Sequence, residues 1–591
     1  MRNLVILSCA ILLLAIWAGY LYSTTYIRNR RAFREEYDFI VVGGGTAGII
    51  VAHEIALHSN FSVLLVEAGG QFGWLSTIPL AATLLQGSSV DWAFKTVPQE
   101  NVARGLHGKR MCYPRGKGLG GSGQLNYMLH TEAVPEELDK WMEVGGKNWG
   151  YESLKCYLLK LYRSGVRCHE RFWNSRRFYK TFIDTESSKL SHVVSKATID
   201  LNSRSNSNFT FRLAEYTTKN GRRWSSFDEY LYPSLRRPRF HLMMNTQVQK
   251  VVFDGKKRAI GVKIQMESGQ KVVRVRKEVI LSAGSIQTPH ILMVSGIGDQ
   301  RELQQFNIDV VHDAPHVGKN LFDHLTTPIY VSINESLSVT KEKVLSLKNA
   351  MRYFLHGTGI FSNAAIIGMV REKQAPHSLF IFGIGSADEA ALRVISNYDM
   401  ETFNALFPLN ANDTQEGFVL IGTCHFPQSR GSIGLRGNSI TKTPMINPNF
   451  LANISDVQCI RDALKLGMQI VQSKVFQKIG AKIHWPKLKQ CRHVTLSEAS
   501  IPTDEYLECA IRTLSVSGHH PSGTCAIGRV LDNQLRVKGV RKLRVIDGSI
   551  FVNPLSAFPN SVIAAIAERA SHMILDKYIT SEKSENDSES F

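Results

Sequence analysis

Two adjacent histidines near the end of the chain have the residue type and the setting for proton-transfer chemistry. They stand in SGHHPSGTCAIG (517–528), where His520 precedes Pro521 and Gly523 follows shortly after. A proline disfavours helical backbone for the residue before it, so we expect His520 to be extended, and Gly523 permits a turn that most residues avoid. An imidazole titrates near neutral pH, which suits a general base. On these residues alone, a surface loop that carries a histidine pair stays the alternative.

A glycine pattern near the start of the chain predicts a dinucleotide site. Gly43-x-Gly45-x-x-Gly48 stands between the strand-like DFIVV and the helix-like IIVAHEIALHS, and a second strand-like run, SVLLVEAGG, follows. The three glycines serve a tight turn, close approach of a pyrophosphate, and helix–strand packing. The anion then lies on the helix N-terminus, and an acidic residue closing the second strand can bind ribose. We assign to this half of the cofactor Gly43, Gly45, Thr46, Ala47, Gly48, Glu67 and Ala68.

Two further segments are punctuated by glycine. RGKGLGGSGQLN (115–126) can expose backbone N–H groups as an anion nest, although a flexible linker is the alternative. GSIQTPHILMVSGIG (284–298) reads as a helix, with Pro289 in its first turn and glycines at its end, and we interpret His290 in it as structural. The first loop and the apolar NYML run after it add Gly121, Ser122, Asn126, Tyr127, Met128 and Leu129 to the predicted cofactor residues.

Taken together, these segments resemble the glucose-methanol-choline (GMC) oxidoreductase family, with this chain as an insect-type member. The resemblance runs from about Asp38 to Tyr578 and also includes LFDHLTTP, PQSRGSIGLRG, PMINPNFL and LRVIDGSI. It implies FAD as the cofactor and oxidation of alcohols as the reaction. It also adds Val248, Ala283 and Asp547 to the cofactor residues. Some members hold FAD covalently through a histidine before the first-signature asparagine; Leu125 stands there, so we expect non-covalent FAD.

The resemblance also assigns the catalytic pair. The histidine that matches the family's H-P-x-G-T segment is His520, and the second active-site position corresponds to Asn560 in FPNSVIAAIAER. Oxidation of an alcohol removes a hydroxyl proton and a hydride; the flavin accepts the hydride and a base must take the proton. The chain departs from the family's usual pattern at His130, where an aromatic or small residue is common, and at Phe558 and Pro559, where a polar pair is common.

The elements that must position these residues belong to an α/β fold. We expect a discontinuous, Rossmann-like FAD-binding domain with an inserted α+β substrate domain built on an antiparallel sheet. The expected ranges are 1–34 for an N-terminal hydrophobic segment, 36–330 for the FAD-binding domain (with part of the substrate domain near 150–235), 331–510 for the substrate domain, 511–578 for the return to the FAD-binding domain, and 579–591 for a polar, disordered tail.

Composition excludes some functions and leaves others open. The 591 residues are too many for one core, and the net charge of +19 is spread along the chain without a recognition motif, so we do not expect nucleic-acid binding. The nine cysteines contain no CxxC pair, which predicts neither a metal site nor a dense disulfide scaffold. One or two disulfides are compatible with the spacing, Cys156–Cys168 or Cys491–Cys509, but the pairing cannot be read from sequence.

The N-terminal run LVILSCAILLLAIWAGYLY (4–22) carries no charge and is long enough to span a bilayer. We favour an uncleaved anchor in the secretory pathway over a cleaved signal peptide that would leave a secreted protein. Arginines after the segment argue for a cytosolic continuation, whereas six N-glycosylation sequons argue for the lumen, so the orientation stays open.

The leading hypothesis is therefore an FAD-dependent alcohol dehydrogenase or oxidase, with a small-molecule alcohol as substrate and an unknown electron acceptor, either oxygen or a quinone- or dye-like compound. An apolar alcohol, such as a retinoid or a sterol, is one possibility, and a sugar or choline-type substrate is the alternative. A non-catalytic flavin-binding protein of the same fold is the hypothesis from another class, and an NAD-dependent enzyme is disfavoured by the length of the resemblance. Oligomeric state is not readable.

Overall fold

The computed structural model describes residues 33–589 apart from 170, 173–175, 179, 183–188, 205–207, 267–268 and 495–501, with the backbone alone over 581–589. The apolar run predicted as a membrane anchor (4–22) lies outside the described residues. Within the described part of the chain, every helix is too short or too polar to cross a bilayer.

The first of two large sheets carries the dinucleotide motif. Its parallel strands are β11 (Phe240–Met243), β2 (Val63–Val66), β1 (Glu36–Val42), β14 (Gly269–Leu281) and β26 (Leu543–Val545), in that spatial order. The buried strands are rich in β-branched residues, as both faces of a parallel sheet are covered. The antiparallel strands β12 (Val248–Phe253) and β13 (Ala259–Met266) extend it beyond β14. The predicted discontinuous Rossmann-like domain is confirmed, because strands from the start, middle and end of the chain pair side by side.

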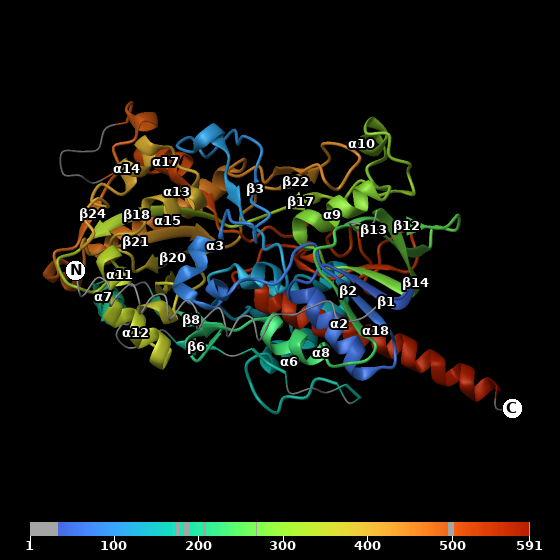
Figure 1. Cartoon of the computed structure of the whole chain (residues 1–591). Helices are drawn as coiled ribbons and strands as arrows, with labels where there is room; N and C mark the ends of the chain where they lie inside the picture. Colours follow the sequence, from blue (N-terminus) through green and yellow to red (C-terminus); the bar gives the residue numbers. More distant parts are fainter. Residues whose placement is uncertain are drawn as a thin grey trace, which may run out of the picture.

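Helices cover this sheet. α2 (Thr46–His58) follows β1, α9 (Gly284–Val294) follows β14, and α18 (Pro559–Glu589) follows β26. α2 and α18 pack along each other (Figure 1). α18 continues to Glu589, through most of the tail for which composition predicted disorder, and its last turns project from the body in Figure 1. A helix that is already nucleated adds residues at little cost, which composition alone does not reveal.

The second large sheet is antiparallel. It runs β24 (Lys482–His484), β18 (Leu325–Ser332), β21 (Gly417–Cys424), β20 (His377–Phe382), β19 (Ile366–Glu372) and β7 (Phe209–Leu213), and β25 (Val516–Ser517) pairs with β18. α15 (Ile454–Val471) packs on β20 and β21. The predicted antiparallel substrate sheet is therefore present. Its strands β18 and β25 reach past the ends of the expected 331–510 range, which places the sheet directly beside His520.

Short elements make up the rest. The remaining helices are α3 (Ala82–Leu85), α4 (Pro135–Asp139), α5 (Met142–Gly145), α6 (Tyr151–Lys160), α7 (Lys189–Arg204), α8 (Tyr232–Ser234), α10 (Gln300–Gln305), α11 (Lys341–Leu345), α12 (Leu347–His356), α13 (Glu389–Ser396), α14 (Met400–Leu406), α16 (Lys474–Lys478) and α17 (Asp504–Leu514). The short strands are β3 (Phe94–Lys95), β4 (Cys112–Tyr113), β5 (Leu129–His130), β6 (Thr181–Phe182), β8 (Glu215–Tyr216), β9 (Thr218–Lys219), β10 (Arg222–Arg223), β15 (Ile297–Gly298), β16 (His312–Asp313), β17 (Lys319–Leu321), β22 (Gly431–Gly434) and β23 (Met445–Asn447).

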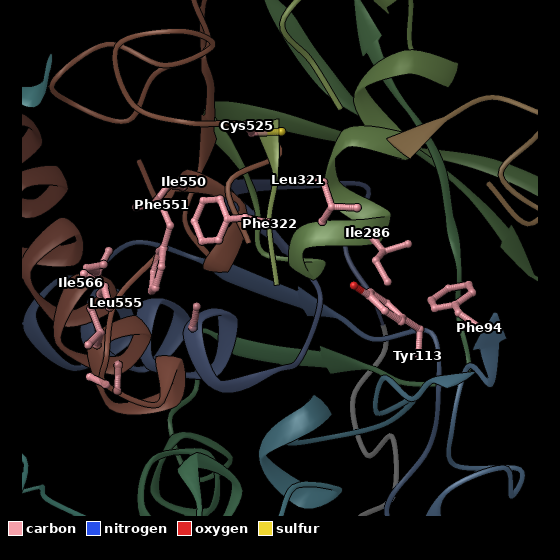
Figure 2. Close-up of a cluster of buried hydrophobic side chains, with 14 of the residues drawn as sticks. Phe94, Tyr113, Ile286, Leu321, Phe322, Cys525, Ile550, Phe551, Leu555 and Ile566 are labelled. Carbon is pink, nitrogen blue, oxygen red and sulfur yellow. The ribbon is translucent and has the colours of Figure 1, made fainter. Parts of the chain in front are cut away.

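Three disulfides hold the described part of the chain. Cys156–Cys168 and Cys491–Cys509 agree with the two pairs that the spacing allowed, and Cys424–Cys459 joins β21 to α15. Cys525 stays a free, buried thiol within the apolar core behind the histidine segment, near Phe322 and Leu321 (Figure 2).

Candidate active site

One cavity joins the dinucleotide turn to the histidine segment. His520 and Asn560 line it together with Glu67, and so do most of the predicted cofactor residues: Gly43, Gly45, Thr46, Ala47, Ala68, Gly121, Ser122, Val248, Ala283 and Asp547. Segments more than 400 residues apart in sequence thus form one site, as the sequence predicted.

The three glycines of the turn have distinct roles. Gly43 has a φ of 102°, a conformation that residues with a Cβ rarely adopt. A Cβ on Gly48 would overlap the carbonyl oxygen of Gly43, so this glycine serves helix–strand packing and does not line the cavity. A Cβ on Gly45 would meet nothing nearer than the Cα of Gly121, at 3.9 Å. Gly45 is therefore free of packing constraints from the protein and borders space left for a ligand.

Glu67 closes β2 at the far end of the cavity. The backbone N–H of Gly44 donates to its Oε2 at 2.7 Å and that of Gly69 to its Oε1 at 2.9 Å. Burial raises the pKa of the Glu67 carboxyl, while these N–H donors lower it. The carboxylate is thus held rigidly in the place where a ribose hydroxyl is recognised in dinucleotide folds.

Four predicted cofactor residues at the end of the second glycine loop do not line the cavity. Asn126, Tyr127, Met128 and Leu129 were predicted as cofactor residues, but they are not among those that line it. Asn126 is instead held by Arg223, whose guanidinium donates to its Oδ1 and its carbonyl oxygen, both at 2.7 Å. The same guanidinium donates to the carbonyl of Gly123 at 3.0 Å, so these bonds shape the loop.

The third glycine-punctuated segment anchors the histidine segment. Pro289 lies inside α9, not in its first turn as predicted. A proline has no N–H, so the carbonyl of Ser285, four residues earlier, loses its helical partner. The hydroxyl of Thr524 donates to this carbonyl at 2.7 Å. The proline thus creates the acceptor that fixes the HPSGT loop. His290 is fully buried and does not line the cavity, in keeping with its structural interpretation.

The His520 backbone is held by a buried carboxylate. Oδ1 of Asp323 accepts from the His520 N–H at 2.7 Å, and the Ser517 hydroxyl donates to its other oxygen. Gly523 has a φ of 87°, and a Cβ there would overlap the ring of Phe322, which Figure 2 shows beside this segment. The surface-loop alternative is therefore wrong for this segment, which is packed against the core.

The tautomer of His520 follows from its neighbours. Nδ1 of His520 lies 2.9 Å from Nδ1 of His324, and Nε2 of His324 lies 3.1 Å from the carbonyl oxygen of His425. A carbonyl only accepts, so His324 carries its proton on Nε2 and presents a bare Nδ1. His520 must then donate from Nδ1, which leaves its Nε2 unprotonated. This hydrogen-bond relay, from the His425 carbonyl through His324 to His520, leaves Nε2 of His520 as the basic nitrogen.

Both rings of the relay are neutral at working pH. Burial, followed by His324 and Arg115, holds the pKa of His520 well below its usual value. Burial likewise lowers the pKa of His324. A base can accept a proton only in its neutral form, and this environment keeps the His520 imidazole in that form before reaction.

Asn560, at the start of α18, completes the pair. The Thr46 hydroxyl donates to its Oδ1 at 2.8 Å. This bond fixes the amide orientation and leaves the NH₂ group as the donor on the cavity side. Thr46 therefore serves both the phosphate turn and the catalytic amide.

Sequence reasoning missed several contributors. Arg115 lines the cavity and donates to the carbonyl of His519, and Trp92 and Phe94 line it as a stacked pair. His324, in the LFDHLTTP segment, was noted only as part of the family pattern. A charged residue at the start of a glycine-rich loop was the one signal available for Arg115.

Comparison with known proteins agrees with this site. Two sequence-family models, both described as GMC oxidoreductase, match residues 37–326 and 427–567 of the chain. The chain belongs to the GMC oxidoreductase family. It is 35% identical over 555 residues to the Drosophila melanogaster protein "Neither inactivation nor afterpotential protein G", covering 91% of this chain and 90% of that protein. It is 29% identical over 568 residues to a glucose dehydrogenase (FAD, quinone) of the same species, covering 91% and 87%.

Two further relatives extend the comparison. An ecdysone oxidase of Spodoptera littoralis is 28% identical over 565 residues, covering 92% of each chain. The crystal structure of a formate oxidase has a TM-score of 0.76 at 22% identity and covers 93% of this chain and 100% of that one, which shows a shared fold.

The residues of this GMC oxidoreductase fit FAD. The cavity combines an open glycine at Gly45, a rigid acceptor at Glu67 and a catalytic end at His520. Leu125 is buried in an apolar cluster with Phe72 and Leu85, so its side chain offers nothing for a covalent bond. His130 does not line the cavity and packs against the Tyr162 ring at 4.1 Å, so its departure from the family pattern concerns packing.

Proposed function

We propose that this chain oxidises the CH–OH group of an apolar or aromatic alcohol, with His520 as the base. The observation that carries the proposal is the His425–His324–His520 relay, which leaves a neutral Nε2 on the histidine that lines the cavity. The relay argues against the alternative of a non-catalytic flavin-binding protein, since binding alone requires no such tautomer control.

The chemistry divides between the cofactor and two side chains. FAD, when bound, supplies the two-electron acceptor. His520 Nε2 takes the hydroxyl proton of the alcohol, and the NH₂ group of Asn560 donates a hydrogen bond to the same oxygen as its negative charge develops. The proton stays on His520, whose Nδ1–H keeps its bond to His324, until release to solvent.

An aromatic group beside His520 supports an apolar substrate. The Phe558 ring lies 5.2 Å from the His520 ring and 5.7 Å from Phe380 on β20. Phe382 on the same strand lies 6.1 Å from Tyr127. Phe558, with Pro559, stands where the family commonly has a polar pair before Asn560. Aromatic rings next to the base favour an alcohol with an apolar body over a sugar.

The test is a substrate series with the flavin-loaded protein. We expect aryl and long-chain or isoprenoid alcohols to bleach the flavin absorbance anaerobically, and glucose and choline to do so far more slowly. Repeating the turnover with oxygen and with a quinone identifies the acceptor. A flavin that no alcohol bleaches would favour the non-catalytic alternative, and preference for glucose or choline would reject the apolar substrate.

We also propose that the protein is attached to membrane in the secretory pathway through residues 1–34. Three disulfides among the described residues support an oxidising compartment. Carbonate extraction of native membranes is the test: the full-length chain should stay in the pellet, whereas a chain that lacks 1–34 should be soluble and contain flavin. Full-length protein in the supernatant, with its N-terminus intact, would reject the anchor.

A further inference from the structure

A second group of chemically capable side chains lies away from the catalytic cavity. Glu54 and His58 stand one turn apart on α2, and His572 faces them from α18. The side chains of Glu54 and His572 are 0% and 2% exposed, and that of His58 is 12% exposed. None of the three lines the cavity that contains His520, and the proposed reaction uses none of them.

Two of the three spacings between the ligand atoms match those of a tetrahedral metal site. Oε2 of Glu54 lies 3.4 Å from Nε2 of His58 and 3.3 Å from Nε2 of His572, and all three atoms lie within 4.8 Å of one another. Tetrahedral Zn²⁺ binds nitrogen and oxygen at about 2.0 to 2.2 Å, which sets neighbouring ligand atoms about 3.3 to 3.6 Å apart. Both spacings to Glu54 already have this value, which is long for a strong charge-assisted hydrogen bond.

The two imidazoles can both present Nε2 to an ion. Nε2 of His58 is buried and makes no hydrogen bond within the described residues. Nε2 of His572 forms a hydrogen bond with Oε2 of Glu54 at 3.3 Å, and its Nδ1 lies 3.2 Å from the hydroxyl of Tyr157. In the tautomer in which Nδ1 donates to Tyr157, Nε2 has no proton and can bind an ion instead. Metal-binding histidines commonly have such a partner on the second nitrogen, which fixes the ring.

The charges of the cluster favour a cation. Among its described residues, two buried carboxylates, Glu54 and Glu568, accompany one buried lysine, Lys160, which pairs closely with Glu568. A divalent ion beside Glu54 balances the group and compensates the cost of burying carboxylates.

We propose that Glu54, His58 and His572 bind a zinc ion, with a solvent molecule as the fourth ligand. Two nitrogens and one carboxylate oxygen are a donor set that suits Zn²⁺ better than Ca²⁺ or Mg²⁺. The ion ties α2, which follows the first strand of the FAD-binding domain, to α18, which ends it. Its role is structural, and the partly exposed edge of His58 is its route of entry.

The first experiment measures zinc in the tag-free, flavin-loaded protein by elemental analysis. We expect one zinc per chain, loss of the zinc to a strong chelator with a lower melting temperature, and recovery of both on adding ZnCl₂ alone. Replacement by CoCl₂ should give the visible bands of tetrahedral Co²⁺ at longer wavelength than the flavin. Wild-type protein without stoichiometric zinc, whose melting temperature responds to neither chelator nor ZnCl₂, would overturn the proposal.

Variants distinguish a zinc site at Glu54, His58 and His572 from a network in which these residues only form hydrogen bonds with one another. His572→Gln and Glu54→Gln should abolish zinc binding, while His356→Ala, at an exposed histidine on α12, should leave it intact. Tyr157→Phe should weaken zinc binding by about 10- to 100-fold and retain the fold, since it removes only one hydroxyl, which contacts His572 and Arg569, and keeps the ring. If Tyr157→Phe and Glu54→Gln bind zinc as the wild type does, the ion lies elsewhere and the assignment is wrong.

Discussion

Nδ1 of His520 lies 2.9 Å from Nδ1 of His324, and between two neutral rings such a contact holds one shared proton. The carbonyl of His425 decides which ring donates it. His324 is therefore a positioning residue, which acts on the alcohol only through His520.

Replacing His520 tests the base. His520→Ala should bind FAD normally, because the glycine turns hold the cofactor, and should lose about 100- to 10,000-fold in the rate of flavin reduction by alcohol. His519→Asn is the matched control. His519 contributes its carbonyl to Arg115 and has a φ of 65°, which asparagine tolerates. Stopped-flow reduction measures both. If His519→Asn is the more damaged variant, the register of the site is wrong by one residue.

Replacing His324 tests the relay. His324→Ala should keep FAD and slow flavin reduction by about five- to tenfold, the effect of losing one hydrogen bond of roughly 1 to 1.5 kcal/mol. A purely structural role predicts unchanged tautomers of His520. ¹⁵N NMR of the labelled imidazole distinguishes the two: the Nδ1–H form should dominate in the wild type, and both forms should appear in the variant.

Gly45 and Gly48 of the turn give a matched pair of variants. Gly45→Val should keep the fold and contain no flavin, because its Cβ meets no protein atom nearer than 3.9 Å and its side chain enters the space left for the ligand. Gly48→Val should fail to fold, because its Cβ would overlap the Gly43 carbonyl. Flavin content and circular dichroism read the outcome. A Gly45→Val protein with its full complement of FAD would contradict the cofactor site.

Buried histidines predict sensitivity to acid. Burial lowers the pKa of His53 to about 4, that of His130 to about 3 and that of His290 to about 4. In the unfolded chain these groups take up protons below about pH 6.5, whereas in the folded protein they stay neutral. Stability is therefore lost as pH falls from about 6.5 towards 4, measurable as a falling melting temperature.

His130 supplies the control for that prediction. Both its ring nitrogens are buried without a hydrogen bond among the described residues, and its ring packs at a tilt against Tyr162. His130→Phe keeps the ring and removes the titration, so it should raise the melting temperature and flatten its dependence on pH below about 6.5. A wild-type slope in this variant would mean that His130 does not contribute.

The sequons predict glycosylation, provided that the chain faces the lumen. Asn60, Asn208, Asn334, Asn412 and Asn453 are all exposed. Peptide N-glycosidase should shift the electrophoretic mobility of the native protein. Asn412→Gln and Thr414→Ala should remove the same glycan, since both destroy one sequon. A native protein that the enzyme does not shift would place the chain in the cytosol.

Short sequence motifs were enough to predict the part of the cavity formed by the dinucleotide turn. Gly43, Gly45 and Glu67 lie within one βαβ unit, where short-range pattern and ligand geometry are tightly linked. His324 and Arg115 reach His520 only through the packing of distant segments, and no spacing rule reports that. Asn126 to Leu129 do not line the cavity, because residues that are contiguous in a motif need not face the same way: Arg223 holds Asn126 through two hydrogen bonds. Cys424–Cys459 was missed for the same reason, since β21 and α15 meet only in the folded domain.

The hydrogen bond from Thr46 to Asn560 has a consequence for biosynthesis. Thr46 leaves the ribosome early, but its partner is synthesised 514 residues later, together with the strand β26 that completes the first sheet. The nascent chain must therefore keep an unfinished parallel sheet edge, prone to mispairing, until translation ends. The cavity lining, which includes Asp547 and Asn560, is therefore complete only once nearly the whole chain has been made, and a premature stop anywhere before Asn560 yields a product without the amide.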